Sequence, residues 1–256
     1  MDKLTLNHLS ASYGKNIVFQ DVQIELVSQS MNFIIGANGC GKTTLLKCIN
    51  SLKDYQGEIL LNNRNLKDLK RNELAKEVAM ISQISDVSFS YSLYETVLMG
   101  RYAHKRDVLS SYSKEDEEIT LDCLKRVGLL NEKEKMLHTC SGGQLQRVYI
   151  ARMLAQNPKV VLLDEMTNHL DIKYQIELLS FIREWAKSED KIILGVLHDL
   201  NLVNSFADKV YLLDEGCIKR EGTPRNVLGS NDLSKAFSMD IRTWMLKSAK
   251  LWEDVE

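Results

Sequence analysis

Residues 36–43 constrain the fold of this chain more than any other stretch. They read GANGCGKT, follow a short apolar run at 32–35 and precede a helical pattern at 43–50. Glycine lets backbone N–H groups turn toward an anion, and the start of a helix adds unpaired donors and a positive dipole end. The pattern predicts a strand, a phosphate-binding loop and a helix, in that order. The alternative is a glycine-rich turn that binds nothing.

The loop also predicts which atoms would hold a nucleotide. Lys42 is expected to reach the β- and γ-phosphates, and the hydroxyl of Thr43 is expected to bind Mg²⁺. The side chain of Cys40 stands at a free position of the motif and receives no role. The loop residues predicted to contact the nucleotide are Gly36, Asn38, Gly39, Cys40, Gly41, Lys42, Thr43 and Thr44.

Composition narrows the class of protein. The chain has 256 residues, of which 44% are hydrophobic, so a substantial core is expected. A net charge of −2 argues against a broad basic surface for nucleic acid. The five cysteines are scattered without a CxxC, which suggests neither a disulfide framework nor a zinc ribbon and fits a reducing cytosol. No stretch approaches the roughly 18 apolar residues of a membrane span.

The rest of the chain alternates between strand and helix patterns. Strands are predicted at 3–9 and 18–27, paired antiparallel, and at 32–35, 58–61, 78–81, 160–163, 192–196 and 209–213. Helices are predicted at 43–50, 93–100, 114–128, 141–155 and 174–187. This rhythm predicts an α/β fold with a mostly parallel sheet covered on both faces, interrupted by a helical insertion at about 85–156.

Polar side chains follow the later predicted strands. Asp164 and Glu165 come directly after the apolar run 160–163, at the edge where α/β sheets bind ligands. Asp164 is predicted to hold Mg²⁺, and Glu165 to orient or deprotonate an attacking water. Alone, two acids after a strand are often only solvated. Together with the phosphate loop they indicate the second half of a nucleotide site.

Two more residues are candidates by position. His198 follows the apolar strand at 192–197, which should neighbour the Asp164 strand, so its imidazole is expected to reach the γ-phosphate. The alternative is a structural or surface histidine. Gln83 follows the strand at 78–81 and is expected to touch Mg²⁺ or the attacking water; by itself it is a polar loop residue.

A second helix start carries two unexplained glycines. Ser141 and Gln144 form an S-x-x-Q capping box, but this does not explain Gly142 and Gly143, which are poor helix formers. Open backbone at a helix start makes a second anion site. Because the chain already has one phosphate loop, we expect this site to bind the same phosphate from another copy of the chain.

These motifs, in this order, resemble the ATP-binding subunits of ABC transporters over nearly the whole chain. The family's motifs match at Tyr13 (adenine stacking), 36–43 (Walker A), Gln83 (glutamine loop), 140–144 (signature), Asp164 and Glu165 (Walker B), 168–171 (D-loop) and His198 (switch histidine). The resemblance implies a P-loop NTPase (ABC ATPase) fold with an antiparallel β-subdomain. It places this subdomain and the RecA-like core at about 1–84 and 157–256, and the helical subdomain at about 85–156.

The resemblance also implies ligands and partners. ATP and Mg²⁺ would be sandwiched in a head-to-tail dimer, or between paired ATPase subunits, with Ser141, Gly143, Gln144 and Asp171 contacting the partner's nucleotide. Membrane permease subunits would dock at about 83–106, where Phe89, Tyr91, Leu93 or Tyr94 are docking or packing residues. An extracytoplasmic substrate-binding protein would act indirectly, no nucleic acid would bind, and the chain would lie at the cytoplasmic face of the membrane.

The chain departs from the family pattern twice. Cys140 replaces the leucine that usually begins the signature, and Met166 replaces the proline that usually follows the Walker B glutamate. Neither position supplies a phosphate ligand, so we expect ATP hydrolysis to survive. Loss of the proline is expected to loosen the D-loop turn.

Three stretches indicate the cargo class. ETVLMGRYAHKRD, VLHDLNLVNSFADKVYLLDEG and EGTPRNVL resemble importers of metal chelates, which carry iron(III)-siderophores, haem or cobalamin. The alternatives are the ATPase of a zinc or manganese importer, and an ABC ATPase with no role in transport.

Overall fold

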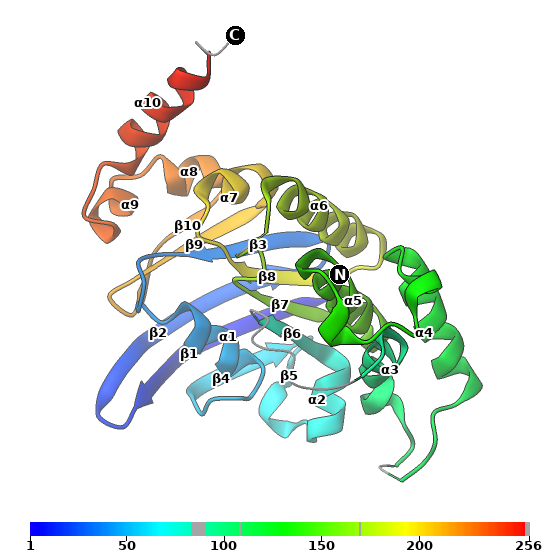
Figure 1. Ribbon diagram of the computed structural model, residues 1–256. Coiled ribbons are helices and arrows are strands. Elements are labelled where there is room, and N and C mark those ends of the chain that lie inside the picture. The colour runs from blue at the N-terminus through cyan, green and yellow to red at the C-terminus, as the bar shows by residue number, and fades with distance from the viewer. Residues whose placement is uncertain (83–90, 108, 169, 254–256) are drawn as a thin grey trace.

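A six-stranded sheet lies at the centre of the structure (Figure 1). This computed structural model describes residues 1–82, 91–107, 109–168 and 170–253. The strand order is β10-β9-β3-β8-β7-β6. The strands are β3 (Ser30–Ile35), β6 (Val78–Ser82), β7 (Val160–Asp164), β8 (Ile192–Val196), β9 (Lys209–Asp214) and β10 (Cys217–Gly222). Every neighbouring pair is parallel except β9 with β10, which confirms the predicted, mostly parallel sheet.

A second, antiparallel sheet has the order β2-β1-β4-β5. Its strands are β1 (Lys3–Tyr13), β2 (Asn16–Val27), β4 (Gln56–Leu61) and β5 (Arg64–Asn65). The predicted pairing of the first two strands is confirmed, and both are longer than predicted. The extra length of β1 carries Tyr13 to the end of the strand.

The helices include several that the sequence did not predict. The α-helices are α1 (Lys42–Ile49), α2 (Arg71–Glu77), α3 (Leu93–Leu98), α4 (Lys114–Arg126), α5 (Gly142–Gln156), α6 (Ile172–Ser188), α7 (Leu200–Phe206), α8 (Pro224–Leu228), α9 (Asn231–Ala236) and α10 (Ile241–Glu253). The 3₁₀ helices are η1 (Leu66–Asp68), η2 (Met99–His104), η3 (Leu130–Glu132) and η4 (Leu137–Thr139). The unpredicted α2, α7, α8 and α9 have seven residues or fewer, too short to show a helical period. Helix α10 was also not predicted, although its 13 residues are long enough to show such a period.

Side chains alternate between the two faces of the six-stranded sheet. On β7, Val161 and Leu163 join one apolar cluster, while Val160 and Leu162 join the other. The first cluster includes residues of α5, α6, α7, α8 and α9. The second is closed by α1 and the antiparallel sheet. Both faces are therefore covered, as predicted, and the carboxyl ends of the parallel strands meet at one edge.

Helices α3, α4 and α5 pack together beside the sheet (Figure 1). The helix predicted at 93–100 ends at Leu98 and continues as the tighter η2. At Gly100 a Cβ atom would lie 2.3 Å from the main-chain oxygen of Arg152, so glycine lets η2 pack directly on α5. The division of the chain into core and helical subdomains stays a prediction.

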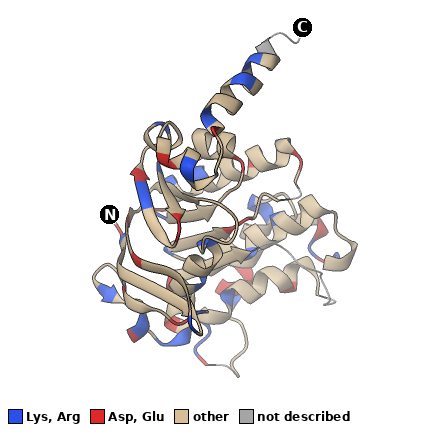
Figure 2. Ribbon diagram, turned by 90° about the vertical axis from the view of Figure 1, so that its left-hand side faces the viewer, with Lys and Arg blue, Asp and Glu red and all other residues tan. Residues whose placement is uncertain are grey.

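Helix α10 projects away from the body of the molecule in both views (Figures 1 and 2). Lysine and arginine residues lie among aspartate and glutamate over the ribbon in Figure 2 rather than on one face. Within the described residues, no helix has the length and apolar character needed to cross a membrane.

A buried ion pair joins η2 to α4. The Nε of Arg101 donates to Asp116 Oδ1 at 2.9 Å, and both side chains are about nine-tenths buried. Hydrogen bonds from Ser113 and Arg101 hold the pKa of Asp116 below its ordinary value, although burial opposes them. Removing one partner would leave the other charge buried without compensation.

We therefore predict that Arg101→Met destabilises the protein by about 3 kcal/mol. The matched control is Lys173→Met, which breaks an exposed pair with Glu177 and should cost less than about 0.5 kcal/mol. Urea denaturation of both variants measures the difference. If both variants lowered the free energy of unfolding by the same amount, the buried pair would be no more important for stability than the exposed one, which would contradict this prediction.

Candidate functional site

A pocket of about 510 Å³ lies at the carboxyl edge of the sheet. The residues that line it come from the end of β1, the start of β2, the loop before α1, the first turn of α1 and the turns after β7 and β8. They are Tyr13, Val18, Asn38, Gly39, Gly41, Lys42, Thr43, Thr44, Glu165 and His198. The structure thus brings together most of the residues that the sequence predicted for a nucleotide site.

The phosphate loop needs glycine at its first position. Gly36 has φ 151°, and a Cβ atom there would lie 2.0 Å from the main-chain oxygen of Leu213. The buried ammonium of Lys42 donates to the carbonyl oxygens of Gly36 and Ala37, each at 2.9 Å. The loop therefore encloses a fixed cation next to the free N–H groups at the start of α1.

Thr43 and Asp164 meet across the sheet. The Thr43 hydroxyl donates to Asp164 Oδ1 at 2.9 Å, although Thr43 follows β3 and Asp164 ends β7. Burial raises the pKa of the Asp164 carboxyl, and the hydrogen bond from Thr43 partly offsets this effect. A hydroxyl and a carboxylate oxygen therefore lie side by side at the rim of the pocket.

Glu165 is held in an unusual conformation. Its φ of 55° lies in the left-handed region, which non-glycine residues seldom adopt. Nε2 of His198 lies 2.7 Å from Glu165 Oε1, and the amide of Asn168 donates to Oε2 at 2.8 Å. The strand that ends at Asp164 was predicted to lie beside the strand that precedes His198. The pairing of β7 with β8 confirms this prediction. Backbone strain of this kind gathers at functional sites.

Two residues that the sequence did not single out support this site. Asn168 was expected only as part of the D-loop, and its position three residues after Glu165, within a tight turn, is the signal that could have identified its contact. Lys53 places its ammonium 4.2 Å from the centre of the half-exposed Tyr13 ring. We found no sequence signal for that contact, since Tyr13 and Lys53 are 40 residues apart in the chain.

The start of α5 confirms the predicted capping box. The Ser141 hydroxyl accepts from the N–H of Gln144, whose side chain accepts from the N–H of Ser141. At Gly142 a Cβ atom would meet no described heavy atom within 4 Å, and at Gly143 it would lie 3.9 Å from the Tyr174 ring. Neither glycine has a positive φ. Nothing in the described part of this chain therefore requires glycine at these two positions.

Some predicted residues lie outside the pocket. Ser141, Gly143, Gln144 and Asp171 do not line it among the described residues, because they stand at the starts of α5 and α6. Gly36 and Cys40 belong to the same loop as the lining residues but do not line it either. Asp164 is also absent from the lining and reaches the pocket only through its contact with Thr43. Gln83 falls outside the described residues, as does Phe89.

The two departures from the family pattern have ordinary surroundings. Met166 is buried, and its carbonyl accepts from the amide of Gln146 at 2.8 Å. The amide of Gln175 donates to the carbonyls of Thr167 and Leu170, which ties the turn to α6. Burial raises the pKa of the Cys140 thiol. The Sγ atom of Cys140 lies 3.5 Å from the carbonyl oxygen of Met136, the residue directly before η4. Looser packing of the D-loop stays a prediction.

The residues expected to dock the permease or to pack within the chain differ in their burial. Leu93 is fully buried in the helical cluster, and Tyr94 packs partly buried against it. Tyr91 is 40% exposed. Leu93 is therefore a packing residue, because its side chain has no surface to offer a partner.

Comparison with known proteins decides the family. The ABC transporter family matches residues 19–168, which is more than half of the chain. The chain belongs to the ABC transporter family. Such chains are the ATP-binding, ATP-hydrolysing members of the family, so this chain is an ABC ATPase.

The relatives of this ABC ATPase include proteins of iron uptake. The petrobactin import ATP-binding protein FpuD of Bacillus anthracis is 34% identical, over 93% of this chain and 87% of that one. The probable siderophore transport system ATP-binding protein YusV of Bacillus subtilis is 35% identical, over 94% and 87%. A solved inward-facing transporter of the metal-chelate type is similar with a TM-score of 0.81 and 28% identity, over 93% and 90%.

We predict opposite effects of alanine at two glycines of this ABC ATPase. Gly36→Ala should lower the free energy of unfolding by about 2 kcal/mol or more, since the new Cβ atom meets a main-chain oxygen. Gly142→Ala should leave it within about 0.5 kcal/mol or raise it slightly, since alanine is the better helix former and finds open space. Urea denaturation measures both variants. A clear loss of stability in Gly142→Ala would mean that this glycine is needed within the chain.

Proposed function

We propose that the chain is the ATP-hydrolysing subunit of a metal-chelate importer and works as a head-to-tail dimer with ATP between the two copies. One observation carries the proposal: the phosphate loop, Glu165 and His198 line one pocket, with Asp164 bonded to Thr43 beside them, while a Cβ atom at Gly142 would meet no described heavy atom within 4 Å. The names of the relatives supply the cargo class.

The residues of the pocket take these roles in hydrolysis. The loop N–H groups and Lys42 bind the β- and γ-phosphates, and Tyr13 stacks on the adenine with Lys53 against its ring. Glu165 orients the attacking water and accepts its proton. His198 contacts the γ-phosphate and, through its 2.7 Å contact with Glu165, fixes the carboxylate from one side while Asn168 fixes it from the other.

The chemistry of the pocket fits Mg²⁺. Thr43 and Asp164 offer a hydroxyl and a carboxylate next to each other, and Gln83 is the third proposed ligand. The described residues contain no cluster of three or more histidine, cysteine, aspartate or glutamate side chains that could hold a metal by themselves. That suits Mg²⁺, which keeps several waters and shares its ligands with phosphate oxygens. When bound, the ion neutralises charge that develops on the phosphates.

The sandwich explains the glycines of the signature. Ser141, Gly143 and Gln144, with Asp171 of the D-loop, would face the γ-phosphate held by the partner's phosphate loop, and a Cβ atom at Gly142 or Gly143 would stand between helix and nucleotide. Two ATP molecules close the dimer because each then receives donors from both chains. Hydrolysis removes these contacts and lets the dimer reopen.

We predict that Glu165→Gln forms a stable dimer at saturating Mg-ATP, while the wild-type protein stays mostly monomeric. The variant binds nucleotide but loses the general base, so its hydrolysis should fall by about 100-fold or more. Size-exclusion chromatography with and without ATP measures the dimer. A variant that remains monomeric would rule out the ATP sandwich.

The native cysteines give the orientation of that dimer. Cys40 lies in the phosphate loop and Cys140 directly precedes the signature serine, and both residues are partly exposed. A short bis-maleimide should join Cys40 to Cys140 of the partner subunit only when ATP is present, and Cys40→Ser or Cys140→Ser should prevent it. Cys217→Ser removes the exposed thiol as a competing site.

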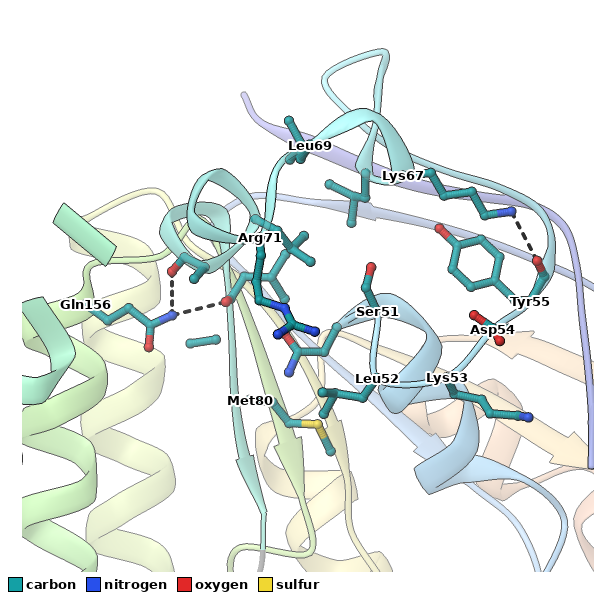
Figure 3. Close-up of a pocket in the computed structure, with 16 residues that line it drawn as sticks. Ser51, Leu52, Lys53, Asp54, Tyr55, Lys67, Leu69, Arg71, Met80 and Gln156 are labelled. Atoms are coloured by element: carbon teal, nitrogen blue, oxygen red, sulfur yellow. Dashed lines mark hydrogen bonds between the residues drawn. The ribbon is translucent and has the colours of Figure 1, made fainter. Parts of the chain in front are cut away.

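The permease is proposed to dock on a pocket of about 960 Å³ at the other end of the sheet from α10, rather than on the segment expected at about 83–106 (Figures 1 and 3). The described residues that line this pocket lie between Asn50 and Met80, together with Gln156. Leu52, which is 67% exposed, and Met80 line it, and Arg71 points into it. These side chains suit a short amphipathic helix that carries an acidic residue opposite Arg71. The chain would then lie at the cytoplasmic face of the membrane, and an extracytoplasmic binding protein would deliver cargo to the permease.

We predict that cells in which Glu165→Gln replaces the natural chain lose uptake of a radiolabelled metal chelate. Iron-siderophore, haem and cobalamin are tested separately, and the chelate whose uptake falls is the cargo. Glu184→Gln, an exposed glutamate on α6, is the matched control and should leave uptake unchanged. A loss of zinc or manganese uptake alone, or of no uptake at all, would contradict the proposed cargo class.

A further inference from the structure

The last residue of α5 contacts the core of the protein through its side chain. The amide of Gln156 donates to the carbonyl oxygens of Ala75 at 2.6 Å and of Val78 at 3.1 Å (Figure 3). Ala75 belongs to α2, and Val78 begins β6. Gln156, Ala75 and Val78 all line the 960 Å³ pocket. One side chain therefore ties α5 to two elements at the rim of the proposed docking pocket.

The same end of α5 is also held from the helical side. Nη1 of the buried Arg101 donates to the carbonyl of Ala155 at 2.8 Å. Nε2 of His104 lies 2.9 Å from the carbonyl oxygen of Gln156, to which it can only donate. Burial lowers the pKa of His104, which favours the neutral ring. The final turn of α5 is thus fixed between η2 on one side and α2 with β6 on the other.

The opposite end of α5 opens at the signature. A helix of 15 residues is about 22 Å long and moves as a rigid rod, so a displacement of its first turn reaches its last. In the proposed sandwich, contact with the partner's nucleotide displaces Ser141 and the glycines after it. The hydrogen bonds of Gln156 transmit this displacement of α5 to the residues at the rim of the pocket.

We propose that Gln156 is a positioning residue that couples closure of the ATP sandwich to the shape of the permease-docking pocket. The inference rests on the function proposed above and adds the residue that transmits the movement. Coupling runs in both directions, so a permease helix seated in the pocket also biases the orientation of α5. Strand β6 connects the pocket rim to the nucleotide site. It runs from Val78 to Ser82, directly before Gln83 in the sequence, and it pairs with β7, which ends at Asp164.

A purely structural role for Gln156 makes a different prediction. Two hydrogen bonds to main-chain carbonyls could serve only to hold α5 on the sheet. Their loss would then change exchange and stability equally with and without nucleotide. A coupling role instead changes the response to nucleotide, which is the quantity to be measured.

Hydrogen–deuterium exchange of the full chain tests the inference. In the Glu165→Gln protein, Mg-ATP should slow amide exchange in residues 71–80, at the rim of the pocket. In Glu165→Gln combined with Gln156→Met, the dimer should still form at the same ATP concentration, but the ATP-dependent change at 71–80 should be lost. Methionine keeps the length of the side chain and removes the donor.

Lys67→Met is the matched control. Lys67 lines the same pocket and also donates to two main-chain carbonyls, those of Tyr55 and Gly57, but among the described contacts it bonds to no residue of α5. Its loss should leave the ATP response at 71–80 intact. If Gln156→Met does not fold, as judged by circular dichroism, Gln156→Glu replaces it, since a carboxylate cannot donate to the two carbonyls.

The outcomes separate the two proposals. A Glu165→Gln protein that does not dimerise with ATP overturns the proposed function, and the inference with it. A dimer whose response at 71–80 is the same with glutamine, methionine or glutamate at position 156 overturns the inference alone. Loss of the response in Lys67→Met as well as in Gln156→Met also overturns it, because any change at the pocket would then have the same effect.

Discussion

The contact between Thr43 and Asp164 depends on the whole parallel sheet. Thr43 lies in the first turn of α1, which follows β3, and Asp164 ends β7. Strand β8 separates β3 from β7, and the two side chains meet at 2.9 Å only because all three strands end at the same edge. A register shift of one residue in β7 would turn Asp164 to the other face of the sheet. The alternation of Val160 and Leu162 with Val161 and Leu163 between two apolar clusters prevents that shift. Core packing thus fixes the geometry of the nucleotide site.

The glycines of this chain fall into two groups with different physical causes. Gly36 and Gly100 are needed within the chain, because a Cβ atom at either position would meet a main-chain oxygen at 2.0 or 2.3 Å. Within the described residues, a Cβ atom at Gly142 would meet no heavy atom within 4 Å, and its φ is not positive, so nothing there requires glycine. Glycine lowers the stability of a helix. Where no contact within the described chain requires glycine, its presence suggests that another molecule approaches that surface. That contrast, rather than the motif alone, supports the sandwich.

Much of the site could be predicted from the sequence, because each motif is local. The loop at 36–43, the acids after β7 and the capping box of α5 are each set by a few consecutive residues, and the parallel sheet brings the first two together. Contacts between distant segments could not be predicted in the same way. Lys53 meets Tyr13, and Gln156 meets Ala75 and Val78, only after the sheets have packed. Leu93 illustrates the converse, since the sequence left it open between docking and packing, and its full burial shows that it packs. Helices such as α2 were missed because seven residues do not show a clear period.

The apolar core limits how the helical region can move. One continuous cluster includes Leu124 of α4, Leu154 of α5, Phe33 of β3 and Trp185 of α6, so these elements cannot separate without exposing buried surface. Close-packed interfaces of this kind permit small sliding movements rather than opening. Apolar surfaces that slide past each other exchange one neighbour for another at little cost in free energy, so they transmit little of a small movement. Directional contacts such as hydrogen bonds resist the same movement and therefore transmit it. The hydrogen bonds of Arg101, His104 and Gln156 at the end of α5 are directional, and for this reason they, rather than the cluster, determine where the movement of the signature helix is delivered.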